Sequence, residues 1–219
     1  MTTEPQPAGP EEPPVLPLTE PLHASSGEAR PVLTVDMDGV FCRPFFGWNA
    51  GIHRTFLDPT ADAPGATVPP RWLATPLDHV RFNPRRPLPG ARDALRRLHE
   101  VRRLVVVTGR RTYPYWWLNR HGFLDLFERV MVNEGRMSSP HYKVEALAVL
   151  DAAEHVDDDP RTAQLLAQRT SARVFLREWP RSAGVLLDPR VERVRDLHHL
   201  ADVLGAPPAP SREGETPRR

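Results

Sequence analysis

The chain has few of the features that would mark it as secreted, membrane-bound or nucleic-acid-binding. Its one cysteine, Cys42, excludes an internal disulfide framework. No apolar run approaches the roughly 20 residues that a bilayer-spanning helix needs, and the N-terminus lacks the basic and then apolar order of a signal peptide. A net charge of +1 over 219 residues gives no basic field of the kind that binds nucleic acid. We therefore expect a soluble, cytoplasmic protein.

Lysine is almost missing as well. Of the 29 basic residues, Lys143 is the one lysine and the others are arginines. An ammonium and a guanidinium differ in shape, hydration and ease of pKa shift. A lysine kept where arginine serves everywhere else predicts a site that needs a compact ammonium, with chance survival as the alternative.

Both ends of the chain lack hydrophobic periodicity. Residues 1–30 hold seven prolines and five glutamates, and residues 206–219 place prolines among Ser, Glu and Arg. Such segments cannot bury enough apolar surface to order themselves. We expect two disordered tails around one domain at 31–205.

Inside that domain, strand and helix patterns alternate. Strands are expected at 32–35, 104–107, 129–132, 155–156 and 173–176, and helices at 90–100, 115–121, 142–150, 162–169 and 197–204. Alternation of this kind predicts an α/β fold: a Rossmann-like, doubly wound parallel sheet with helices on both faces. In such sheets, ligands bind beyond the carboxyl ends of the strands.

The first strand ends in the most informative residues of the chain. Four apolar or β-branched residues, 32–35, run directly into Asp36 and Asp38, and Gly39 follows. Side chains two apart in a strand share a face, so two carboxylates would point to one spot. Unpaired carboxylates in a partly buried place are costly, and a bound cation would account for them. A twelve-residue calcium loop does not fit, because its last position would be Gly47 instead of glutamate.

More polar residues stand at later strand ends or at a helix start. Thr108 and Gly109 follow the second strand, Lys143 lies in the first turn of a helix, and Asp157 and Asp158 follow a short strand. Thr108 could instead cap a helix, and the acidic pair could be a solvated turn. Asp159, before Pro160, is typical of a helix N-cap and is left out of the site.

These motifs, in this order, resemble the four sequence motifs of the haloacid dehalogenase-like (HAD) superfamily, most of whose members are Mg²⁺-dependent phosphatases. The resemblance covers 32–160 and would extend the core to about 205. It implies that Asp36 is a nucleophile that forms an aspartyl-phosphate, and that Asp38 is the general acid and base whose backbone carbonyl also touches Mg²⁺.

The remaining roles also follow from the resemblance. Thr108 and Gly109 would hold the phosphoryl oxygens, Lys143 would neutralise charge, Asp157 would bind Mg²⁺, and Asp158 would complete the metal shell or orient Lys143. The acid at position 38 favours phosphatase or phosphomutase chemistry over carbon–halogen cleavage. The Asp-Met-Asp-Gly-Val segment, with the acidic pair before a proline, looks most like the nucleotidase-like branch.

Two rival functions remain open at this point. A receiver-like signalling module also uses clustered acids, a threonine and a lysine, but there the acidic pair comes first, whereas here it comes last. A catalytically silent scaffold that keeps the phosphate-binding fold is the other rival. The expected substrate is a phosphorylated small molecule, with nucleotides among the candidates.

About 48 residues, 41–88, form a proline-rich insert after the first strand. Long inserts without regular structure in compact domains tend to be functional or disordered. We expect a small loop-built lid; its aromatic residues could equally just anchor the insert to the core. A small lid could admit a macromolecule or be completed by a second copy of the chain, so a homo-oligomer stays open. Residues 113–117, rich in tyrosine and tryptophan, could stack on a substrate ring or pack a helix.

Overall fold

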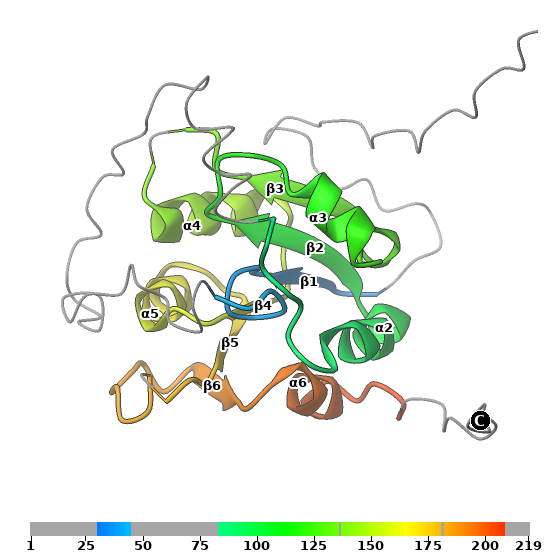
Figure 1. Cartoon of the computed structure of the whole chain (residues 1–219). Coiled ribbons are helices and arrows are strands. Elements are labelled where there is room, and N and C mark those ends of the chain that lie inside the picture. Colours follow the sequence, from blue (N-terminus) through cyan, green and yellow to red (C-terminus); the bar gives the residue numbers. More distant parts are fainter. Residues whose placement is uncertain (1–29, 45–82, 136, 181, 209–219) are drawn as a thin grey trace, which may run out of the picture.

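The structure, a computed structural model, describes residues 30–44, 83–135, 137–180 and 182–208, which fold around one six-stranded sheet (Figure 1). Neighbouring strands are all parallel, in the order β3-β2-β1-β4-β5-β6. The strands are β1 (Val32–Val35), β2 (Arg103–Thr108), β3 (Arg129–Val132), β4 (Glu154–Asp157), β5 (Arg173–Arg177) and β6 (Val191–Val194). The predicted Rossmann-like parallel sheet is confirmed.

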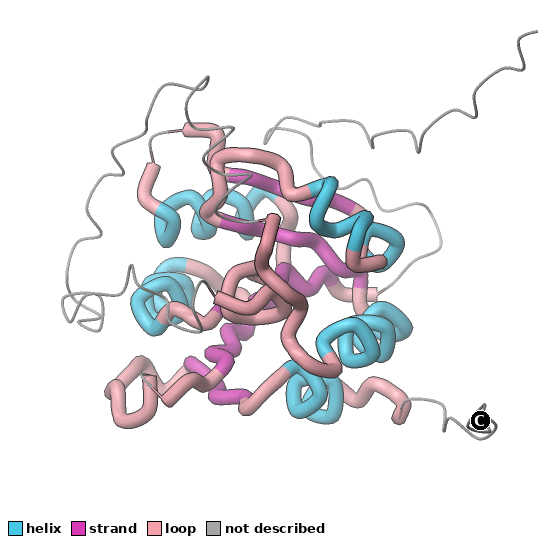
Figure 2. Tube along the Cα trace, viewed as in Figure 1, coloured by secondary structure: helices cyan, strands magenta, loops and turns pink. Residues whose placement is uncertain are grey.

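Helices cover both faces of this sheet (Figure 2). The helices are α2 (Ala91–Val101), α3 (Tyr115–Arg120), α4 (Ser139–Val149), α5 (Pro160–Arg169) and α6 (Leu197–Val203), with a short 3-10 turn, η3 (Leu124–Leu126). One apolar core lies between the sheet and α2, α3 and α6, and a second lies between the sheet and α4 and α5. Every residue of β2 is buried, because helices cover the sheet on both faces. A strand covered in this way has a continuous apolar sequence, as residues 104–107 do.

The alternation of side chains along β1 and β4 decides which way the candidate residues point. Leu33 and Val35 of β1, and Val156 of β4, belong to the core beneath α2 and α6. Residues at the alternate positions therefore point to the opposite face. There Thr34 lies directly across from His155 in the strand register. Asp36 and Asp157, two residues further on, follow on that side, where α4 and α5 pack.

Several elements extend beyond the patterns that predict them. Helix α4 begins at Ser139 instead of residue 142, and α5 begins at Pro160 instead of residue 162. The expected cap is present, since the Asp159 side chain accepts a hydrogen bond from the backbone N of Arg161. Strand β6 is not predicted, because only Val194 of its four residues is buried and its centre is Glu-Arg. An edge strand of this kind carries no hydrophobic pattern that marks it.

The chain leaves the fold after β1 and returns close to where it left. The backbone N of Arg43 donates to the Arg86 carbonyl at 2.8 Å, and that of Leu88 donates to the Phe41 carbonyl at 2.8 Å. An antiparallel bridge joins Cys42 and Pro87 between these two bonds. We call residues 41–44 and 83–88 the two feet of the insert. The predicted lid itself, at 45–82, lies outside the described residues.

The two predicted tails lie almost entirely outside the described residues too. The chain is in contact with α2 as far as Pro207, whose carbonyl accepts a 2.6 Å hydrogen bond from Arg97. Within the described part, every helix is too short or too polar to cross a bilayer.

Candidate active site

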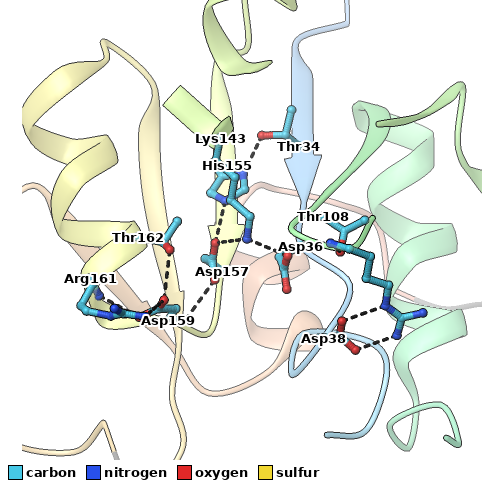
Figure 3. Close-up of polar contacts among 11 residues, drawn as sticks. Thr34, Asp36, Asp38, Thr108, Lys143, His155, Asp157, Asp159, Arg161 and Thr162 are labelled. Atoms are coloured by element: carbon cyan, nitrogen blue, oxygen red, sulfur yellow. Dashed lines mark hydrogen bonds and ion pairs between the residues drawn. The ribbon is translucent and has the colours of Figure 1, made fainter. Parts of the chain in front are cut away.

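The carboxyl ends of three adjacent strands bring the predicted residues to one edge of the sheet (Figure 3). Lys143, from α4, lies between two of the acids. Its Nζ is 2.6 Å from Oδ1 of Asp36 and 2.7 Å from Oδ2 of Asp157. All three residues are buried. The structure thus brings together three residues that the sequence analysis assigned to one site and that lie up to 121 positions apart in the chain.

The charges of this trio depend on one another. Burial raises the pKa of Asp36 to about 7, with Asp157 and Asp38 adding to the rise and Lys143 opposing it. Burial also acts to raise the pKa of Asp157, but Lys143 and then His155 outweigh it and hold that pKa below its usual value. For Lys143, burial acts to lower the pKa, and the two carboxylates reverse this and raise it. Lys143 is therefore a permanent cation between two acids of unequal strength.

Asp158 brings a third carboxylate to the same place. Asp36, Asp157 and Asp158 each offer an oxygen, and these oxygens lie within 4.8 Å of one another. Three buried carboxylates thus lie together, with the Lys143 ammonium bound to two of them, and hard oxygen ligands are those that Mg²⁺ prefers. The donor set therefore fits a magnesium ion, held by Asp36, Asp157 and Asp158.

Gly39 makes room for that arrangement. Its φ of 82° lies in the left-handed region, and a Cβ built on it would lie 2.0 Å from Oδ2 of Asp158. A side chain of any kind at position 39 would displace this carboxylate. The glycine that follows the two acids in sequence is therefore required by the close approach of Asp158.

We expect Gly39→Ala to weaken Mg²⁺ binding at least tenfold and to lower the thermal midpoint of unfolding. Gly184→Ala is the matched control, because Gly184 has a φ of 81° and nothing lies within 4 Å of its added Cβ. Both variants carry the strain of alanine at positive φ, roughly 1 kcal/mol, and only Gly39→Ala moves Asp158. Calorimetric titration with MgCl₂ measures the difference. Equal Mg²⁺ affinity in the two variants would show that Asp158 has no part in holding the metal.

Thr34 and His155 form a polar layer beneath the acids, and sequence reasoning missed both. His155 is fully buried, with Nε2 3.1 Å from Oδ2 of Asp157 and Nδ1 2.7 Å from the Thr34 hydroxyl. Burial lowers the pKa of His155, so the ring is neutral. The tautomer with hydrogen on Nε2 donates to Asp157, and its Nδ1 can accept the Thr34 hydroxyl hydrogen, for which the Glu154 carbonyl at 3.1 Å is a second acceptor. The signal was available, since each residue stands two positions before a predicted site acid.

Asp38 lies in a different environment from Asp36. Arg110 donates to it through Nε and Nη2, at 2.8 and 2.7 Å, and Arg85 donates through Nη1 at 2.6 Å. Burial acts to raise the pKa of Asp38, but Arg110 and then Arg85 hold it below its usual value. From the sequence, Arg110 could reach a phosphate or be solvated surface; the structure shows a residue that is 5% exposed and bonded to Asp38. Solvated arginine is the common case, and nothing in the sequence marked this one as buried.

Thr108 and Gly109 lie at the same edge of the sheet. Thr108 ends β2 and is buried, and its Oγ1 accepts a 3.3 Å hydrogen bond from the backbone N of Arg110. A Cβ on Gly109 would lie 2.4 Å from Oγ of Ser139, the first residue of α4. The segment after β2 therefore passes tightly against the start of the helix that carries Lys143. Their role as phosphoryl-oxygen donors stays a prediction.

The other residues weighed in the sequence have structural positions. Cys42 is buried, and burial raises the pKa of its thiol to about 12, so it is an inert core residue. Trp117 is fully buried against Phe41 and Phe123. Trp116, in contrast, is 49% exposed. In the aromatic run 113–117, Trp117 is thus part of the core, Tyr113 and Tyr115 pack against it, and Trp116 faces solvent.

Comparisons with known proteins agree with this geometry at the level of the fold. No protein-family model and no curated protein matches the chain. Solved structures do match. One is L-2-haloacid dehalogenase from Xanthobacter autotrophicus with chloropropionic acid covalently bound, at a TM-score of 0.55 and 12% identity, covering 80% of this chain and 98% of that one. The chain has the haloacid dehalogenase-like fold.

Two further structures carry the same fold. A putative HAD-hydrolase from Bacillus subtilis, bound to magnesium, matches with a TM-score of 0.53 and 13% identity, over 81% of this chain and 100% of that one. A HAD-superfamily hydrolase of subfamily IA from Geobacter sulfurreducens matches with a TM-score of 0.50 and 19% identity, over 83% and 100%. The HAD-like fold expected from the motifs is confirmed, and identities this low carry the comparison no further than the fold.

Proposed function

We propose that this protein is a Mg²⁺-dependent phosphomonoester hydrolase that acts on a phosphorylated small molecule through an aspartyl-phosphate on Asp36. The observation that carries the proposal is the buried group of Asp36, Asp157 and Asp158, with Lys143 bound between the first two. A carboxylate that attacks a phosphate dianion meets electrostatic repulsion. A cation site and a fixed ammonium beside the same carboxylate remove that repulsion.

Each side chain then has a role that its position allows. Asp36 attacks phosphorus and becomes covalently phosphorylated, and Lys143 neutralises charge on Asp36 and on the phosphoryl oxygens. Asp38, once it has turned away from the arginines that keep it ionised and has taken up a proton from solvent, gives that proton to the departing oxygen and later takes one from the hydrolytic water. A magnesium ion, when bound, supplies electrostatic stabilisation of the phosphoryl oxygens. Thr34 and His155 fix the direction of the Asp157 carboxylate from below.

Dehalogenation is the second candidate, because a dehalogenase is among the structures of this fold. The acidic group favours phosphate chemistry. A carbon–halogen bond needs one attacking carboxylate and no divalent cation, whereas this chain gathers three carboxylates within 4.8 Å of one another. A general acid and base at position 38 would also have no role with a halide leaving group, because a halide departs without a proton.

The two functions separate in a paired assay. We expect hydrolysis of an aryl phosphate in the presence of MgCl₂, at least 100-fold slower after EDTA treatment and restored by added Mg²⁺. We expect no halide release from 2-chloropropionate with or without metal. Halide release that persists in EDTA, with every phosphate ester in a broad panel left intact, would replace the proposed function with dehalogenation. No turnover of either class would support a catalytically silent module.

A further inference from the structure

The contacts of Asp38 with its two arginines go beyond what the proposed chemistry needs. Both carboxylate oxygens of Asp38 are engaged: Oδ1 by Arg85 and Arg110, and Oδ2 by Arg110 alone. Three charge-assisted hydrogen bonds hold it, two of them from one guanidinium in a fork. A side chain that must turn to a leaving oxygen is thus held by two cations of the protein.

Both arginines are placed by contacts that do not involve Asp38. The backbone carbonyl of Arg85 accepts a 2.7 Å hydrogen bond from the indole Nε1 of Trp117, a fully buried residue. The carbonyl of Arg110 accepts a 2.9 Å hydrogen bond from the backbone N of Asn133. Anchored backbones and buried stems make the pair a preorganised binding element, whatever anion lies between its members.

Exposure shows which partner can be exchanged. The side chains of Arg85 and Arg110 are 6% and 3% exposed, whereas that of Asp38 is 22% exposed. The arginines therefore form the inner wall, and the carboxylate is the member nearest to solvent. An anion arriving from solution would reach the position of Asp38 without displacing either guanidinium.

The chemistry of the fork indicates what that anion is. Asp38 accepts three hydrogen bonds from the two buried guanidiniums, and a buried guanidinium that gives up a bonded carboxylate loses a strong interaction. When Asp38 turns to the departing oxygen, another oxyanion can accept those three hydrogen bonds. A carboxylate is the replacement that preserves both the charge and the fork geometry that arginine recognises.

We propose, on the basis of the proposed function, that Arg85 and Arg110 form a carboxylate subsite on the leaving-group side of the active site. In the substrate-free protein the side chain of Asp38 occupies this subsite. A substrate carboxylate takes its place and releases Asp38 toward the ester oxygen. The substrate class is therefore phosphate esters of hydroxy acids. Because Arg85 lies in the returning foot of the insert, that foot supplies a specificity residue.

The test compares esters that differ only in the second anion. The probes are 2-phosphoglycolate and its two longer homologues with one and two more methylene groups, each paired with its uncharged amide. We expect the wild-type protein with Mg²⁺ to prefer the acid over the amide by at least tenfold in kcat/KM for at least one chain length. A gain of that size is what one or two charge-assisted hydrogen bonds typically contribute.

Variants on the same foot then assign the preference. Arg85→Gln is expected to bring the acid-to-amide ratio close to one. Arg86→Gln is the matched control, because Arg86 is the exposed neighbour and loses the same charge without touching Asp38. It should keep the wild-type ratio. Circular dichroism and thermal unfolding establish that each variant is folded.

Each outcome has a defined meaning. If the wild-type protein hydrolyses acids and amides equally at every length, the carboxylate subsite is wrong while the phosphatase assignment stands. The same holds if Arg85→Gln slows acids and amides by the same factor, because the arginine would then act on the transferred phosphoryl group. If no phosphate ester is hydrolysed, the proposed function itself fails. The comparison of acids with amides uses the wild-type protein alone. It can therefore contradict the proposal even if Arg85→Gln does not fold.

Discussion

Replacing Asp36 with asparagine is expected to abolish phosphate-ester turnover and yet to stabilise the metal-free protein. Asparagine has nearly the same shape but cannot form the acyl-phosphate, so we expect a loss of at least about 10³-fold in kcat. The stability gain follows from burial, which raises the pKa of Asp36 to about 7. A carboxylate that resists ionisation in the folded state costs free energy of folding once the solution pH forces it to ionise.

The sign and the pH window follow from the two pKa values. In the unfolded chain the Asp36 carboxyl ionises near its usual pKa of 3.8, and in the folded chain it keeps its proton until about pH 7. Between these values the folded protein binds more protons, so wild-type stability relative to Asp36→Asn falls as pH rises and levels off above about 7. At pH 8 the advantage of the variant is expected to be on the order of 1–3 kcal/mol.

Magnesium should reverse this order. A cation bound by Asp36, Asp157 and Asp158 stabilises the wild-type protein more than Asp36→Asn, which lacks one of the three carboxylates. The gain in the free energy of unfolding grows with the Mg²⁺ concentration. Denaturant unfolding of both proteins at pH 5, 6, 7 and 8 measures the difference in their free energies of unfolding. The series is run once with EDTA and once with about 10 mM MgCl₂. If Asp36→Asn were the less stable protein in EDTA across this range, the electrostatic account of the site would be wrong.

Replacing Lys143 has the second large expected effect. Lys143→Met leaves Asp36 and Asp157 buried without their shared cation, and removing one partner of a buried ion pair typically costs about 3–5 kcal/mol. We expect the metal-free variant to be unfolded or close to it at neutral pH. Added Mg²⁺ should recover part of the free energy of unfolding, because the metal replaces the missing positive charge.

Lys143→Arg separates charge from shape. The guanidinium keeps the charge but is too large and planar for a position held at 2.6 and 2.7 Å from two carboxylates, so overpacking of about 1–3 kcal/mol is expected, with activity lost. Arg96→Lys is the control, since this exposed residue of α2 lies away from the site. Full activity in Lys143→Arg would mean that the single lysine of the chain survived by chance.

Much of the site was predictable because strand ends are easy to locate. The run 32–35 marks β1, and the acids that follow had to lie at the sheet edge once parallel order was inferred. Lys143 could be singled out by composition alone. These inferences needed only local patterns and the rule that carboxyl ends of parallel strands share an edge.

What escaped prediction depends on contacts between distant segments. Arg85 and Arg110 look like any other arginine of this chain. They meet at Asp38 because the returning foot pairs with residues 41–43 and the segment after β2 ends at the same edge of the sheet. His155 was included in a strand as an ordinary residue, since its contact with Thr34 requires the β1–β4 register. Strand β6 was not predicted, because its partly exposed Glu-Arg centre breaks the alternation of apolar and polar residues that indicates a strand.

The hydrogen-bonded feet of the insert mark a position where one inserted segment can be replaced by another. Because Arg43 and Leu88 bond across to Arg86 and Phe41, the excursion between them begins and ends at one place on the scaffold. Segments of different length or composition can be spliced in there without altering the register of any strand. Evolution, or a protein engineer, could thus replace the segment between the feet while leaving the sheet and the acids at its edge unchanged.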